Sequence, residues 1–254
     1  NYIAAASGEL KEVTGDNQWV KVDGSWYYVR NHALLKDTKA KIGSSWYLFS
    51  DSGIMYQTNS TVFFKGEPCF VNKDGSLKVN AWGSVNGAKV YYDETGTTVR
   101  GITTIDGVKY LFAYDHNTYY GRLLFNRAFD FPFTSYCDDA NYASDSAGRA
   151  TRLKNNTWTK VDGFWYYVTD HSVLLDTIAQ IGNAYYAFDE AGHMYANTTF
   201  TIKGISYTAD KNGHVTFAQM QDLSDGRYSM DENGKAYTGM KTIGQLKYYF
   251  VNGK

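Results

Sequence analysis

The sequence predicts an all-β fold, a solenoid of stacked β-hairpins built from repeats of about 20 residues and arranged in two duplicated halves. Aromatic residues make up 17% of the 254 residues, and 24 glycines interrupt the chain. Aromatic side chains favour strands, and glycine accepts the positive φ of tight turns. The third observation is internal repetition, which occurs at a long and a short period.

The long period is a duplication. Residues 19–57 align without a gap on residues 158–196, with 21 identities in 39 positions. A weaker match with a one-residue slip continues towards the C-terminus. We therefore expect a first repeat array at residues 1–112 and a second at residues 144–254, joined by an aromatic-rich segment at residues 113–143.

The short period is marked by turns. Asp-Gly and Asn-Gly dipeptides between apolar runs are the strongest short hairpin signal, because both residues accept the positive φ of a type I′ turn. An isolated hairpin is marginally stable in water, so successive hairpins must stack to bury their faces. Such dipeptides include Asp23-Gly24, Asn86-Gly87, Asp106-Gly107, Asp162-Gly163 and Asp225-Gly226.

The joining segment, residues 113–143, has no partner in the second copy and contains Tyr119 and Tyr120. It has two interpretations: a packed junction between the copies, or an insertion that builds one wall of a binding site. The chain also starts and stops in the middle of the repeat pattern, so we expect it to be a piece of a longer protein.

Side-chain directions follow from a two-residue turn at Asp23-Gly24, which pairs Lys21 with Trp26 and Trp19 with Tyr28. Alternation along the strands then places these four side chains on one face and an aliphatic set on the other. The second copy repeats the arrangement, and the next unit adds one aromatic residue per copy. The predicted ligand-binding residues are Trp19, Trp26, Tyr28, Trp46, Trp158, Trp165, Tyr167 and Tyr185, with Tyr119 and Tyr120 from the joining segment.

Such aromatic faces suit two kinds of ligand. Sugar rings stack their C–H faces on aromatic planes while polar neighbours bind the hydroxyls. Quaternary ammonium groups bind in aromatic cages by cation–π attraction. The alternative is that these rings are simply the core of a protein whose units are small.

Motifs for catalysis are missing from the sequence, so we expect no enzymatic activity, no metal site and no cofactor. The net charge of −1 gives no basic field for nucleic acid, and no apolar run is long enough for membrane insertion. The two cysteines, Cys69 and Cys137, have no metal or redox spacing, and whether they pair is left open.

The motif Asp23-Gly24-Ser25-Trp26-Tyr27-Tyr28, followed by Gly53-Ile54-Met55, resembles the cell-wall-binding repeats of Gram-positive bacteria. These include choline-binding modules, glucan-binding modules of streptococcal glucosyltransferases and receptor-binding repeats of clostridial toxins. Residues 104–112 resemble the latter two. The resemblance implies an extracellular protein, secreted or attached to the cell surface.

One difference from the choline-binding repeats narrows the range of expected ligands. Choline-binding repeats generally open with Gly-Trp, but here the corresponding places are Gly101-Ile102 and Gly239-Met240. We therefore expect a non-catalytic carbohydrate-binding module for an α-glucan polysaccharide such as starch or dextran. The alternatives are anchoring to choline or another cell-wall polymer, and adhesion to a protein or host receptor.

Overall fold

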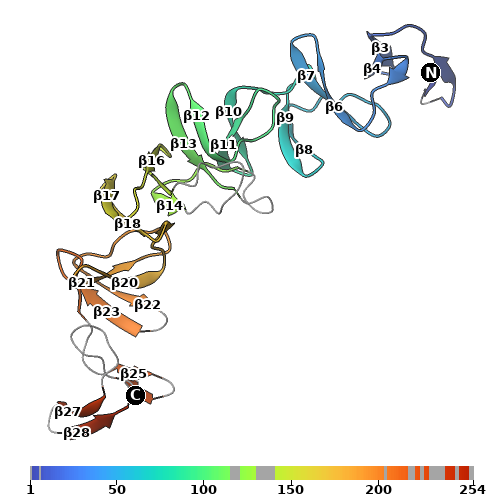
Figure 1. Ribbon diagram of the computed structural model, residues 1–254. Helices are drawn as coiled ribbons and strands as arrows, with labels where there is room; N and C mark the ends of the chain where they lie inside the picture. The colour runs from blue at the N-terminus through green and yellow to red at the C-terminus, as the bar shows by residue number, and fades with distance from the viewer. Residues whose placement is uncertain are drawn as a thin grey trace. The chain divides into compact units, whose positions relative to one another are not determined.

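The computed structural model describes residues 2–5, 7–114, 121–129, 141–202, 205–216, 221–223, 226–228, 238–243 and 246–251. Throughout these residues the chain forms strands and turns and no helix, which confirms the predicted all-β class (Figure 1). The first strands are β1 (Tyr2–Ala4), β2 (Leu10–Glu12), β3 (Gln18–Val22), β4 (Ser25–Arg30), β5 (Ala33–Leu34), β6 (Thr38–Ile42), β7 (Ser45–Phe49), β8 (Ser60–Phe64), β9 (Glu67–Val71), β10 (Ala81–Val85), β11 (Ala88–Tyr92), β12 (Gly101–Ile105) and β13 (Val108–Phe112).

The remaining strands repeat the pattern of short antiparallel pairs. They are β14 (Arg127–Phe129), β15 (Tyr142–Ser144), β16 (Ala150–Arg152), β17 (Thr157–Val161), β18 (Phe164–Thr169), β19 (Ser172–Val173), β20 (Thr177–Ile181), β21 (Ala184–Phe188), β22 (Thr198–Ile202), β23 (Ile205–Ala209), β24 (Val215–Thr216), β25 (Gln221–Leu223), β26 (Gly226–Tyr228), β27 (Gly239–Ile243) and β28 (Leu246–Phe250). Among the described residues, every sheet has two or three strands, and these strands follow one another along the chain.

The chain divides into two compact units. The first comprises Asn1–Thr103 and Phe112–Leu123, and the second comprises Thr104–Leu111 and Leu124–Lys254. Strand β15 spans residue 143, where the sequence places the end of the joining segment. The three-part division of the sequence stays a prediction.

The hairpin register is the predicted one. Trp19 lies opposite Tyr28 and Lys21 opposite Trp26 in β3–β4, and β17–β18 repeats this pairing in the second copy. At the turn between β3 and β4, Asp23 has φ 47° and Gly24 has φ 83°, as a type I′ turn requires. The turn expected at Asp225-Gly226 is displaced by one residue, because Gly226 pairs with Leu223 inside β25–β26.

The hairpins β3–β4 and β6–β7 each contribute to two hydrophobic cores, because alternate side chains point to opposite faces. In the first unit, Val22, Tyr27 and Val29 of β3–β4 pack with Ile3 of β1. The aromatic face of the same hairpin packs against β6–β7, and the opposite face of β6–β7 packs against β8–β9. This sharing of cores between neighbours confirms the predicted stacking of hairpins within the unit.

The second copy begins with a hairpin that corresponds to β1–β2. Tyr142 of β15 pairs with Arg152 of β16, as Tyr2 of β1 pairs with Glu12 of β2. β14 adds a third strand to the hairpin of the second copy. Tyr119, Tyr120 and Cys137 lie outside the described residues, whereas Cys69 is a buried free thiol.

Candidate functional site

The aromatic face of β3–β4 is centred on Trp19. Its ring centroid lies 5.0 Å from that of Tyr28, 4.9 Å from that of Tyr47 and 6.2 Å from that of Trp26. All three pairs are edge-to-face, the geometry in which aromatic quadrupoles attract. Trp19 therefore joins the two hairpins, while Trp26 stands at the margin of this cluster.

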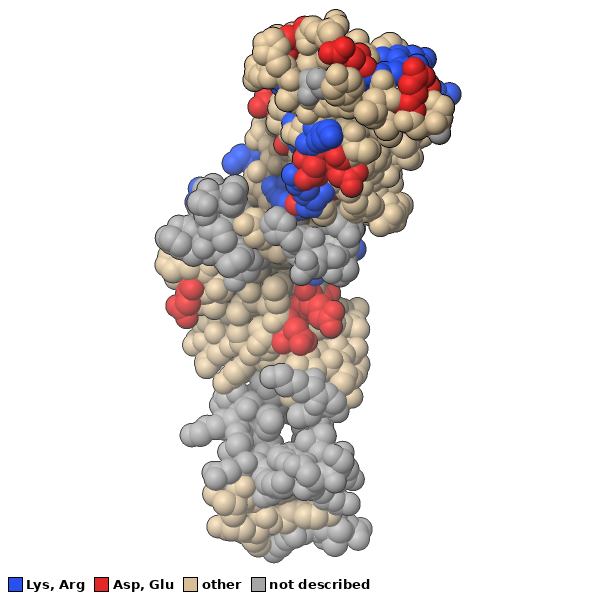
Figure 2. Space-filling model, turned by 90° about the vertical axis from the view of Figure 1, so that its right-hand side faces the viewer, with Lys and Arg blue, Asp and Glu red and all other residues tan. Residues whose placement is uncertain are grey.

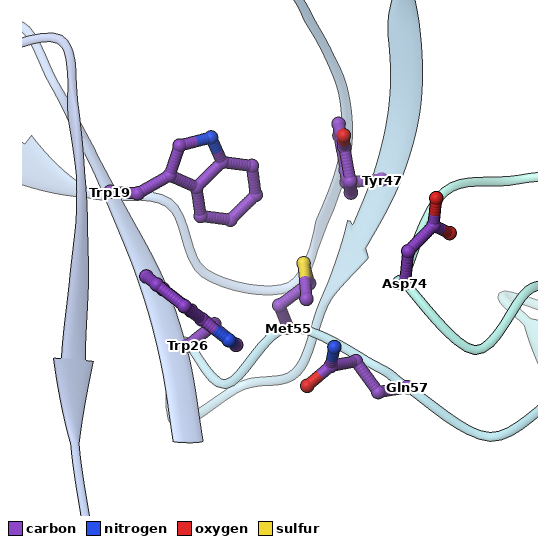
Figure 3. A pocket seen from close by; sticks show the side chains of 6 residues that line it. All are labelled: Trp19, Trp26, Tyr47, Met55, Gln57 and Asp74. Atoms are coloured by element: carbon purple, nitrogen blue, oxygen red, sulfur yellow. The ribbon is translucent and has the colours of Figure 1, made fainter. Parts of the chain in front are cut away.

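A cavity of about 380 Å³ opens beside these rings. In Figure 3, Trp19 and Trp26 face Tyr47 across it, with Met55 between them. The backbone N–H of Met55 donates to the carbonyl of Trp26 at 2.8 Å, which fixes the methionine beneath the tryptophan. The pocket therefore has an apolar aromatic lining supplied by two consecutive hairpins and the connector that follows them.

Two polar side chains complete the lining, Gln57 and Asp74 (Figure 3). Asp74 accepts hydrogen bonds from the hydroxyl and the backbone N–H of Ser76, at 2.6 and 2.9 Å. These bonds hold the pKa of Asp74 below its usual value, so the group is a carboxylate at neutral pH. The site thus offers an amide and a hydrogen-bond acceptor next to aromatic planes.

A lysine accompanies the tryptophan at the margin. The ammonium of Lys21 lies 5.2 Å from the centroid of Trp26, within the range of cation–π attraction, and Lys160 lies 5.6 Å from Trp165 in the second copy. Each lysine is the cross-strand partner of its tryptophan. One side of this ring is therefore next to a positive charge.

The second copy repeats the aromatic geometry. The centroid of Trp158 lies 6.3 Å from Trp165, 5.0 Å from Tyr167 and 4.8 Å from Tyr186. Met194 again donates its N–H to the carbonyl of the marginal tryptophan, at 2.9 Å. Trp165 is 39% exposed, so this ring is available at the surface.

The polar lining differs between the copies. Matching connector hydrogen bonds place Ala196 and Asn212 where the first copy has Gln57 and Asp74. Equivalent aromatic faces are thus combined with different polar groups.

The structure brings together six of the predicted residues, in two sets of three. Trp19, Trp26 and Tyr28 share one face, and so do Trp158, Trp165 and Tyr167. Their role in binding stays a prediction.

The predicted partners from the next unit lie elsewhere. Trp46 packs on the opposite face of its hairpin with the core of Cys69 and Val71, and Tyr185 packs with the core of Phe200. The residues next to Trp46 and Tyr185 in sequence, Tyr47 and Tyr186, point to the aromatic face instead. Strand alternation in β6–β7, applied as it was to β3–β4, would have identified them.

The hairpin β10–β11 carries a variant of this arrangement. Trp82 lies 5.2 Å from Tyr91 and 5.9 Å from Phe112, which parallels the contacts of Trp19 with Tyr28 and Phe49. Lys89 replaces the marginal tryptophan, and its ammonium lies 4.3 Å from the centroid of Trp82. A ring that already has a cation this close is a poorer site for a ligand cation.

The distribution of charged residues shows no surface typical of nucleic-acid binding on the face that Figure 2 draws, within the part of the chain that the structure describes. On the face drawn in Figure 2, basic and acidic side chains are interspersed and no extended basic patch appears among the described residues. Across those residues there is no group of three or more potential metal ligands and no helix long and apolar enough to cross a membrane.

The family model of the putative cell wall binding repeat matches residues 17–31 and 40–55. These stretches contain β3–β4 and β6–β7, the two hairpins that supply the aromatic rings of the pocket. These two stretches are therefore similar to cell-wall-binding repeats, the family that their motifs resemble.

Two curated relatives are glucosyltransferases. Glucosyltransferase-I of Streptococcus downei is 22% identical and aligns with 100% of this chain, and glucosyltransferase-S of Streptococcus mutans is 23% identical over 96% of it. The chain spans only 15% and 14% of the lengths of these enzymes.

The solved structures to which this chain is similar include a choline-binding domain and an alternansucrase. The choline-binding domain of CbpL from Streptococcus pneumoniae is 27% identical, with a TM-score of 0.38, and the match covers 81% of this chain and 100% of that one. Alternansucrase in complex with isomaltononaose is 18% identical, with a TM-score of 0.31, and the match covers 94% of this chain and 18% of that one.

Proposed function

We propose that this chain is a non-catalytic carbohydrate-binding module of a secreted or surface-displayed bacterial protein, and that it binds α-glucan chains at the pocket of Trp19, Trp26 and Tyr47. The observation that carries the proposal is the combination of half-buried aromatic rings with Gln57 and Asp74 in one cavity of about 380 Å³. This volume lies within the range of small-molecule sites, and one or two sugar units would fit.

The chemistry suits a neutral sugar. A glucosyl ring stacks its C–H face on the ring of Trp26, and its hydroxyls donate to the carboxylate of Asp74 or exchange hydrogen bonds with the amide of Gln57. Two relatives named glucosyltransferases favour a glucose polymer as the ligand. Since those relatives are about seven times longer than this chain, a catalytic domain elsewhere in the parent protein would supply any activity.

The test is retention on insoluble α-glucan, together with titration by isomalto- and malto-oligosaccharides. Wild-type protein should be retained on dextran or starch and eluted by the matching soluble oligosaccharide. Release of reducing sugar from these polymers by the purified chain would contradict the non-catalytic part of the proposal.

A second candidate ligand for the same pocket is a quaternary ammonium group such as choline. Three aromatic rings surround the cavity, and the carboxylate of Asp74 provides a counter-charge. Lys21, beside Trp26, opposes a cationic ligand. Choline that raises the melting temperature and displaces bound glucan would favour this candidate, whereas choline without either effect would exclude it.

A further inference from the structure

A second cavity lies in the second copy, away from the aromatic rings. It has a volume of about 290 Å³ and is lined by Asn141, Arg152, Lys154, Asn155 and His171, over the apolar side chains of Leu153 and Val168. The strand pair β15–β16, the segment that follows it and the turn after β18 supply these residues. Polar and basic groups, rather than aromatic ones, surround this space.

Two asparagines build the cavity around the turn at His171. Asn141 donates through Nδ2 to the carbonyl of His171 at 2.7 Å, and Asn155 accepts the N–H of His171 at 3.2 Å. His171 has φ 64°, so these bonds hold the turn in a left-handed conformation. The cavity is therefore formed before any ligand binds.

Asn141 carries an unused acceptor. The residue is only 5% exposed, yet its Oδ1 has no hydrogen-bond partner. A buried polar atom without a partner costs free energy, and such an atom calls for an explanation. A hydroxyl group of a ligand in the cavity would satisfy it.

The charge of the cavity is positive. Arg152 and Lys154 are exposed and form no ion pair with any described residue, and no carboxylate lines the cavity in the part of the chain that the structure describes. The guanidinium of Arg152 can donate two parallel hydrogen bonds to a carboxylate or phosphate, and Lys154 adds a second charge.

The first copy lacks this charge. Glu12 pairs with Tyr2 where Arg152 pairs with Tyr142. The carboxylate of Asp16 accepts the N–H of His32 at 3.0 Å, in the role that the neutral Asn155 has in the second copy. Since the fold forms with acidic residues in one copy and basic ones in the other, stacking of the repeats does not require the basic set.

We propose that this cavity is a second binding site, specific to the second copy, for an anionic saccharide unit. Arg152 and Lys154 bind the carboxylate or phosphate of the sugar, and Oδ1 of Asn141 accepts a hydrogen bond from one of its hydroxyls. The site rests on the proposed function only in that the ligand is a saccharide, because it shares no residue with the aromatic pocket.

The experiment compares glucuronic acid, glucose 6-phosphate, glucose and inorganic phosphate as probes, by calorimetric titration of the whole chain at low and high salt. We expect one or both anionic sugars to bind, more weakly at high salt, and to bind more tightly than glucose. Binding of glucuronic acid would identify a carboxylate as the anionic group, and binding of glucose 6-phosphate would identify a phosphate. Equal binding of glucose, or equal binding of inorganic phosphate, would overturn the assignment.

The variant Arg152→Glu introduces the residue found at the equivalent place in the first copy. It should weaken binding of the anionic sugar by about tenfold or more, because it replaces charge-assisted hydrogen bonds by repulsion. Lys154→Thr, also the residue of the first copy, should weaken it less. Lys11→Glu is the matched control: it makes the same charge change at an exposed residue of β2 and should leave binding intact.

Retention on dextran distinguishes a failure of this proposal from a failure of the proposed function. The Arg152→Glu protein should bind dextran as the wild type does, whereas the Trp26→Ala protein should still bind the anionic sugar. Anionic sugar bound equally by Arg152→Glu and the wild type would overturn the second site and leave the glucan proposal standing.

Discussion

Trp19 and Trp26 show how two tryptophans on one face can have different roles. The ring of Trp19 contacts Tyr28, Tyr47 and Phe49, so it belongs to the core between two hairpins. Trp26 shares fewer of these contacts and lies at the cavity margin next to Lys21. We therefore expect substitution of Trp19 to affect mainly stability and substitution of Trp26 to affect mainly ligand binding.

We predict that Trp26→Ala will reduce retention on α-glucan by about tenfold or more, because one stacking plane for the sugar is lost. The same change should lower the melting temperature only slightly, because Trp26 lies at the margin of the aromatic cluster. Trp19→Ala should instead cost about 3–5 kcal/mol of unfolding free energy, the range for a large aromatic in a core. Urea unfolding and glucan affinity are measured on the same preparations.

The matched control for these variants is Trp46→Phe. Trp46 packs on the far face of β6–β7 and does not line the cavity, so this change should leave glucan affinity as it is. Unchanged affinity in a well-folded Trp26→Ala protein would place the ligand elsewhere.

Asp189 and His193 form a pair that the first copy lacks, since Ser50 and Ile54 take their places. Nδ1 of His193 lies 3.0 Å from the carboxylate of Asp189, which also accepts the N–H groups of Ala191 and His193. Burial raises the pKa of Asp189, but hydrogen bonds and the charge of His193 outweigh it and hold the pKa below its ordinary value of 3.8.

A carboxyl group whose pKa is lowered by folding stabilises the protein above its unfolded pKa, and this contribution is lost as the pH falls through the folded value. Asp189→Asn should therefore destabilise the protein by about 1–3 kcal/mol near pH 6. The difference from the wild type should shrink below pH 3.8, where the unfolded carboxyl protonates. Thermal unfolding from pH 2 to 7 checks this, with the exposed neighbour Glu190→Gln as the control that shows no such trend.

At the scale of the hairpin, turns and register were the most predictable features. The pairing of Lys21 with Trp26 follows from the two-residue turn at Asp23-Gly24, because the turn length fixes every pair along the strands. The same logic defines which side chains share a face. Fold class, hairpin positions and the composition of the β3–β4 face could therefore be predicted from local sequence.

The pocket could not be predicted in full, because four of its residues come from elements that meet β3–β4 only when hairpins stack. Tyr47 belongs to the next hairpin, Met55 and Gln57 to the connector, and Asp74 to the turn after β9. The sequence predicts Trp46 because it occupies the equivalent place in the next unit. Strand alternation directs Trp46 to the next core instead.

Gly24 and Gly75 both have a positive φ, but they differ in how closely other side chains pack around them. Gly24 has φ 83° and open space where a Cβ would be, whereas a Cβ on Gly75 would overlap Cε of Met55. We predict that Gly24→Ala costs about 1–2 kcal/mol, the penalty for a left-handed residue, and leaves glucan binding unchanged.

Gly75→Ala should cost more than Gly24→Ala, because it has the same strain and also displaces Met55 from the floor of the pocket. Glucan affinity should fall together with stability in this variant alone. Urea titration and oligosaccharide titration of both variants provide the comparison, and equal affinities in the two would show that Met55 does not shape the site.

At the scale of the whole chain, duplication produces two copies of one aromatic scaffold with separate polar partners. Gln57 and Asp74 line the pocket in the first copy, and Ala196 and Asn212 take their places in the second. Conversely, the basic cavity at Arg152 belongs to the second copy. The two copies therefore share the rings that join the hairpins and differ in the polar groups beside them.

We predict that the two aromatic sites bind neutral glucan unequally. The first copy offers both an amide and a carboxylate to sugar hydroxyls, whereas the second replaces Gln57 by an alanine, so it should bind a short isomalto-oligosaccharide about tenfold or more weakly. Titration with a trisaccharide should accordingly resolve a tighter site that Trp26→Ala removes and a weaker one that Trp165→Ala removes. We expect a long dextran chain to engage both sites, so each single variant should lose more retention on the polymer than its effect on the trisaccharide implies. A single class of equal sites, or polymer retention that follows trisaccharide affinity in every variant, would show that the copies act alike and independently.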